Sequence, residues 1–136
     1  MSDPERVLYA ALILRLALAA LFFAHAWLKL AVFKPAGTVQ YFESLGLPGF
    51  VAYVTIVGEL AVAVGLLLGV LARIAAIGGI VIVLGTIATV HGKKGWLFTN
   101  KDGGWEYPAF WAIALVVQAL LGDGAWALGP ALGLAV

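Results

Sequence analysis

The chain has 136 residues, of which 64% are hydrophobic and 11% are charged, and its net charge is +1. Soluble domains carry roughly 25% charged residues, so this chain cannot cover its surface with charge and its main solvent must be lipid. The near-neutral charge excludes an electrostatic case for nucleic acid, and the lack of cysteine excludes disulfides, thiolate metal sites and thiol catalysis by this chain.

The length suits four membrane crossings, because a helix needs about 20 apolar residues to cross the hydrocarbon core. We therefore expect an all-α fold, an integral membrane four-helix bundle that forms a single transmembrane domain over residues 1–136. Its helices should cover approximately residues 4–33, 48–71, 73–91 and 106–122, followed by an interfacial tail over residues 124–136.

The first expected helix carries its polar residues on one face. Ser2 and Glu5 have the spacing of a capping box at its start, and Pro35 follows its end. One set of residues repeats at steps of three and four and so shares a face: Arg15, Leu18, Phe22, His25 and Lys29. Since polar groups on a membrane helix turn inward, we expect this face to lie toward the bundle core.

The second expected helix carries one charge, Glu59, near its middle. A carboxylate in hydrocarbon costs at least about 2.5–3.5 kcal/mol, so Glu59 needs a partner or a task. It either forms a structural ion pair with Arg15, accepts a hydrogen bond from His25, or carries a proton. On the same helix, small residues at steps of four predict a ridge for close helix packing: Ala61, Gly65 and Gly69.

The third and fourth expected helices complete the topology. Only a tight turn separates the second helix from the third, so these two should be antiparallel neighbours. Four crossings place both termini on the same side of the membrane, and the loops over residues 34–47 and 92–105 on the other side. Those loops hold most of the lysines, so the positive-inside rule places them in the cytoplasm.

The ionisable residues gather at the loop end of the expected bundle. Counted by depth, five of them should line a polar pocket for a quinone, a lipid or a small anion: His25, Lys29, Glu59, His91 and Glu106. His25 and His91 on different helices could also ligate haem or a metal, but no Glu-x-x-His repeat supports such a centre. The residue types favour a quinone head group, and no catalytic residue is assigned.

Several motifs stand in a characteristic order along the chain. They are Arg15, the His-Ala-Trp-Leu-Lys run over residues 25–29, Leu-Gly-Leu-Pro over residues 45–48, Glu59 with Arg73, His91, Gly-Gly-Trp-Glu-Tyr-Pro over residues 103–108, and Gly-x-Gly over residues 122–124. This ordered set resembles the DoxX family of small four-helix bacterial and archaeal membrane proteins. Ala26 replaces the glycine of the family's His-Gly-x-x-Lys, and Ala127 and Gly129 stand where the family often has Ser and Asp.

The resemblance implies a redox-associated protein of the prokaryotic cytoplasmic (inner) membrane. A related subunit, DoxD, belongs to an archaeal thiosulfate:quinone oxidoreductase. Our leading hypothesis is an accessory subunit of a quinone-linked assembly, an oxidoreductase subunit rather than a stand-alone enzyme. Its partners would be membrane lipid and either other membrane subunits or further copies of itself. The alternatives are a homo-oligomeric transporter or channel for a small anion, thiol or proton, and a structural scaffold that binds partner transmembrane helices.

Overall fold

The computed structural model describes residues 1–134, and every regular element in this range is helical. It has six α-helices: α1 (Asp3–Trp27), α2 (Lys34–Ser44), α3 (Phe50–Leu68), α4 (Ala72–Thr89), α5 (Glu106–Leu121) and α6 (Leu128–Ala131). The expected four-helix count is therefore wrong, because α2 forms within the expected loop over residues 34–47 and α6 forms within the expected interfacial tail. Residues 135 and 136 of that tail lie outside the described part of the chain.

Three helical segments are long and apolar enough to cross a membrane: Asp3–Val32, Phe50–Leu68 and Ala72–Lys93. The apolar α5 has 16 residues, which is about 24 Å at 1.5 Å per residue and short of a hydrocarbon core about 30 Å thick. Helix length within residues 1–134 therefore supports three crossings. A fourth crossing by α5 would need a tilt or local thinning of the bilayer.

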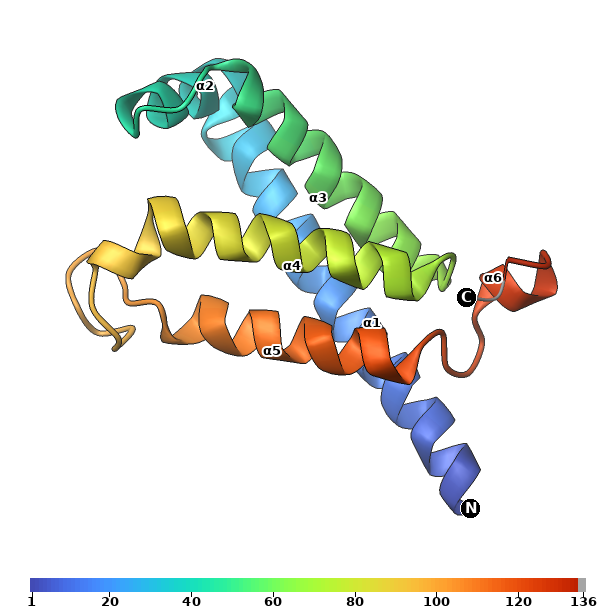
Figure 1. The fold of residues 1–136 in the computed structure, drawn as a ribbon. Helices are drawn as coiled ribbons and strands as arrows, with labels where there is room; N and C mark the ends of the chain where they lie inside the picture. Colours follow the sequence, from blue (N-terminus) through green and yellow to red (C-terminus); the bar gives the residue numbers. More distant parts are fainter. Residues whose placement is uncertain (135–136) are drawn as a thin grey trace.

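The four long helices close a ring of contacts. Helix α1 packs against α3 and α5, and α4 packs against the same two helices (Figure 1). Helix α2 and the turn into α3 lie at the same end of the bundle as the loop between α4 and α5 (Figure 1). The start of α1 and α6 lie at the opposite end, where Ala125 N donates to Leu8 O at 3.0 Å. We call these two ends the loop end and the terminal end.

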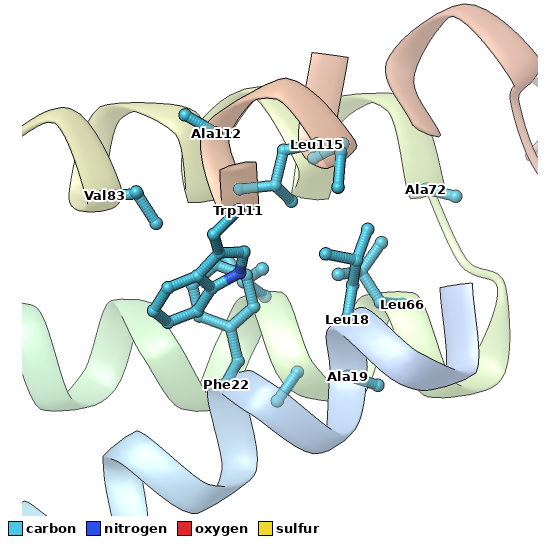
Figure 2. Packing of buried hydrophobic residues seen from close by; sticks show 13 residues of the cluster. Leu18, Ala19, Phe22, Leu66, Ala72, Val83, Trp111, Ala112 and Leu115 are labelled. Carbon is cyan, nitrogen blue, oxygen red and sulfur yellow. The ribbon is translucent and has the colours of Figure 1, made fainter. Parts of the chain in front are cut away.

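The core lies where α1, α3, α4 and α5 meet. Figure 2 shows Phe22 and Trp111 in ring contact, with centroids 4.7 Å apart, and Leu18, Leu66 and Leu115 packed beside them. The Phe22 side chain of α1 packs against the backbone of α4 because Gly79 lacks a side chain. A Cβ at that position would lie 2.8 Å from Cζ of Phe22.

The buried Arg15 ties the terminal end together and is only 1% exposed. Its Nη1 donates to the carbonyls of Leu66 at 2.8 Å and Leu67 at 2.9 Å, and its Nη2 donates to Ala125 O at 2.9 Å. The last carbonyls of a helix have no partner within that helix, so they attract a guanidinium. The expected ion pair between Arg15 and Glu59 is therefore wrong, because Arg15 binds the C-terminal turn of α3 instead.

The small residues of α3 serve different neighbours. Gly65 faces α4, where an added Cβ would lie 3.2 Å from Cβ of Ala75. Gly69 ends α3 with φ +67°, and an added Cβ there would lie 2.6 Å from Cβ of Ala127. Ala61 is exposed. Of the expected packing ridge, Gly65 and Gly69 thus make contacts within the chain, and Ala61 faces outward.

Candidate functional site

A cavity of about 480 Å³ lies at the loop end of the bundle, enclosed by residues from α1 to α5 and from the turns that follow α1 and α4. Its polar wall includes His25, Lys29, Glu59, His91 and Tyr107. Its remaining wall is largely aromatic and aliphatic, with Phe33, Tyr41, Phe42, Leu45 and Leu47 contributed by α2 and the turns on either side of it. Four of the five residues expected in a polar pocket therefore line one cavity.

Lys29 and Glu59 form a buried ion pair in this cavity. Nζ of Lys29 lies 2.9 Å from Oε1 and 3.2 Å from Oε2 of Glu59, so the ammonium donates to both carboxylate oxygens. The side chains of Lys29 and Glu59 are 17% and 4% exposed. Glu59 thus has Lys29 as its partner, in place of the Arg15 or His25 that we expected, and the charge it carries in the membrane interior is compensated.

A change in helix type positions Lys29. The α-helix expected to reach residue 33 ends at Trp27, and Leu28–Val32 forms a π turn closed by Phe33 N donating to Leu28 O at 2.8 Å. The hydroxyl of Thr38 donates to the carbonyls of Lys29 at 3.2 Å and Lys34 at 2.9 Å, which holds α2 against this turn. Single π turns within helices occur frequently at functional sites.

His91 and Tyr107 form the second polar pair. Tyr107 Oη lies 2.9 Å from Nε2 of His91, while Nδ1 of His91 is buried and has no hydrogen-bond partner among the described residues. His91 opens the 3-10 turn after α4, and Tyr107 lies in the first turn of α5. The two residues therefore contact each other where the loop between α4 and α5 begins and ends.

The motif over residues 103–108 places Tyr107. Trp105 N donates to Gly95 O at 2.8 Å and Glu106 N donates to Trp96 O at 3.0 Å, which joins the two ends of the loop. Gly104 is buried against this contact, and an added Cβ would collide with the carbonyl oxygens of Trp96 and Leu97. The glycine therefore permits the close approach that sets the start of α5.

His25 and Trp111 close the inner end of the cavity, toward the core. Their ring centroids are 4.8 Å apart at an interplanar angle of 39°. Trp111 also contacts Phe22, so the cavity ends directly against the hydrophobic core. Tyr107 and Trp111 line the cavity although we did not expect them in the site, and both follow the Gly-Gly-Trp motif closely.

Glu106 does not line this cavity, although we expected it there. It is the first residue of α5 and is half-buried. A carboxylate in the first turn of a helix is stabilised by the helix dipole, which accounts for its position without a ligand. Its neighbour Tyr107 takes the place in the cavity wall because successive helical residues point in directions about 100° apart.

The donors available to a metal are few. Within residues 1–134, no group of three or more His, Asp or Glu side chains is arranged to hold a metal ion. His25 and His91 line the same cavity, so they are the two ring donors that haem or a metal would have there. The remaining polar side chains are neutral hydroxyls, the Lys29–Glu59 ion pair, and Asp102, which pairs with Lys94. This donor set fits a ligand that accepts and donates hydrogen bonds better than it fits a metal.

Comparison with known proteins gives two matches. The DoxX family model matches residues 10–92, a range that includes His25, Lys29, Glu59 and His91. The Bacillus subtilis (strain 168) protein named "Putative oxidoreductase CatD" is 32% identical over 119 residues, which cover 88% of this chain and 84% of that protein. No solved structure matches significantly.

Proposed function

This chain belongs to the DoxX family and is an integral membrane protein, and from this and its cavity we propose that it binds a quinone. In this proposal it is an accessory subunit of a quinone-linked redox assembly in the prokaryotic cytoplasmic membrane. The Bacillus subtilis relative is named "Putative oxidoreductase CatD", and this name supports a redox role. Electron transfer belongs to a partner subunit, and this chain binds and orients the quinone.

The observation that carries the proposal is the division of the cavity into a polar wall and an apolar wall. A quinone has two carbonyl oxygens on a planar ring and an apolar tail. Lys29 and the His91–Tyr107 pair supply hydrogen-bond donors for carbonyl oxygens, and Trp111 supplies a flat apolar surface for the ring. Phe33 and Phe42 line a wall suited to the tail. A volume of about 480 Å³ is typical of ligand pockets.

The proposed topology has α5 as a fourth crossing. Helices α4 and α5 pack along each other in antiparallel directions, which returns the chain to the end where it starts (Figure 1). The cavity then opens near the cytoplasmic surface, because Lys34, Lys93, Lys94 and Lys101 all belong to the loop end. Quinone would reach it within the inner leaflet.

Binding of menadione to the full-length protein in liposomes tests the proposal. Quenching of tryptophan fluorescence reports occupancy, because Trp111 lines the cavity. We expect His91→Ala and Glu59→Gln each to weaken binding about ten-fold, since the first removes a hydrogen-bonding ring from the cavity wall and the second removes the carboxylate that holds Lys29 in place. Leu84→Ala is the control, because this α4 side chain is 52% exposed on the outer surface.

Two results would contradict the proposal. One is wild-type protein that binds no menadione, and the other is equal binding by the wild type and both cavity variants. If the same liposomes then pass protons, thiosulfate or a small thiol, the result supports the transporter hypothesis. A buried ion pair at membrane depth also occurs in transport pathways.

A further inference from the structure

The two ring nitrogens of His91 face different surroundings. Nε2 contacts Oη of Tyr107 at 2.9 Å, and Tyr107 is 41% exposed at the loop end. Nδ1 is buried without a partner, and His91 lines the cavity. One hydrogen bond therefore links the Tyr107 hydroxyl to the His91 imidazole. Together these two side chains connect the surface of the loop end with the interior of the cavity.

A quinone in this cavity would need protons as well as electrons. Reduction to the quinol takes up two electrons, here from a reduced flavin of a partner subunit, and two protons that bind the two ring oxygens. An imidazole can accept a proton at one nitrogen and release another proton from the other nitrogen. His91 has that arrangement, with one nitrogen toward the surface and one buried.

We propose that Tyr107 and His91 form the proton path between the loop-end surface and the bound quinone, an inference that rests on the proposed function. In each step Tyr107 passes its hydroxyl proton to Nε2 of His91, and the proton on Nδ1 of His91 moves to a quinone oxygen. Water at the loop end then reprotonates Tyr107, so one proton enters for each one delivered. One such step delivers one of the two quinol protons. The imidazole returns to its Nδ1–H form by tautomeric exchange before it delivers the second proton, and oxidation of the quinol runs the path in reverse.

The other titratable groups of the cavity are less suited to this path. Both oxygens of Glu59 accept from Lys29, and Glu59 is 3% exposed, so this carboxylate is already paired and has little contact with water. His25 lies at the inner end against Trp111. Asp102, which also lines the cavity, pairs with Lys94 at 3.6 Å on the surface side. Among the described residues facing His91, Tyr107 is the group that is both exposed and hydrogen-bonded to it.

The experiment separates binding from proton delivery. The full-length protein in liposomes is loaded with menadione, and binding is measured for the wild type, Tyr107→Phe and Tyr53→Phe. The bound menadione is then reduced with dithionite in a stopped-flow instrument, in H₂O and in D₂O. Tyr53 is the matched control, because its side chain is 53% exposed on α3 and does not line the cavity.

Tyr107 belongs to the cavity wall, so we expect Tyr107→Phe to bind menadione more weakly than the wild type, and reduction is followed at menadione concentrations that saturate both proteins. Quinol formation in Tyr107→Phe should slow at least ten-fold and show an altered solvent isotope effect, since positioned proton donors contribute about 10²- to 10⁴-fold to such steps. The Tyr53→Phe protein should match the wild type in all three measurements. A His91→Gln variant, which cannot pass a proton through a ring, should show the same slow reduction.

Each outcome decides the matter. If Tyr107→Phe binds menadione and reduces it at the wild-type rate, the proton path is wrong and the quinone site stands. If the wild type binds no menadione, the quinone site fails and the proton path fails with it. Slow reduction in Tyr53→Phe as well as Tyr107→Phe would also overturn the path, because the effect would not depend on the contact to His91.

Discussion

Nζ of Lys29 lies 2.9 Å from Oε1 of Glu59, and this contact joins the π turn after α1 to the middle of α3. Glu59 is buried and Lys29 is largely buried, so the carboxylate depends on the ammonium for compensation. The pair also forms part of the cavity wall, which makes it a structural element and a candidate ligand contact at once.

Breaking this pair from one side should destabilise the protein. Lys29→Met leaves a buried carboxylate without its ammonium, and removal of one partner of a buried pair costs about 3–5 kcal/mol. The double variant Lys29→Met/Glu59→Leu should recover most of that loss, because no charge then remains buried. Thermal unfolding in detergent measures both. A double variant that is as unstable as the sum of the two single variants would show that the contact itself contributes nothing.

Replacing Arg15 should loosen the terminal end. Arg15→Met removes three hydrogen bonds and leaves the carbonyls of Leu66 and Leu67 without a charged donor, at an expected cost of about 3 kcal/mol. Arg6→Met is the control, because its ion pair with Asp3 lies at the surface and should contribute less than about 1 kcal/mol. Equal thermal unfolding of the two variants would contradict the role given to Arg15.

Replacing each of two glycines of α4 with alanine should have different effects on the stability of the protein. Gly79→Ala forces a Cβ to within 2.8 Å of Phe22 and should cost about 1–3 kcal/mol through overpacking. Gly85→Ala meets nothing within 4 Å and should be neutral or stabilising by up to about 1 kcal/mol, through helix propensity. Thermal unfolding compares them, and the second change Phe22→Leu should relieve Gly79→Ala. Failure of that rescue would mean that the strain lies elsewhere.

Single cysteines can test whether α5 crosses the membrane, because the natural chain contains none. Thr99→Cys labels the loop before α5, and Trp126→Cys labels the segment after it, where the native side chain is 80% exposed. If α5 crosses, a membrane-impermeant maleimide added to intact cells should modify only the cysteine at position 126. Modification of both positions from the same side would leave three crossings.

Local patterns in the sequence determined much of this fold. Ser2 and Glu5 form both hydrogen bonds of the predicted capping box, because a cap involves only four neighbouring residues. Leu18 and Phe22 are 2% and 0% exposed, as their 3-4 spacing predicts, because helical periodicity sets which residues share a face. The ordered motifs also indicated the DoxX family, which the family model confirms over residues 10–92.

Only the tertiary structure decided how those faces meet. Arg15 and Lys29 share one face of the first helix about 21 Å apart along its axis, and the sequence cannot show which of them reaches the depth of Glu59. Which of the two reaches Glu59 depends on the axial register of α1 against α3, on the π turn that changes the direction of Lys29, and on the packing of α2 against this turn. Register comes from the summed packing of many side chains on several helices, so no single helix encodes it, whereas helical faces and caps follow from neighbours along the chain.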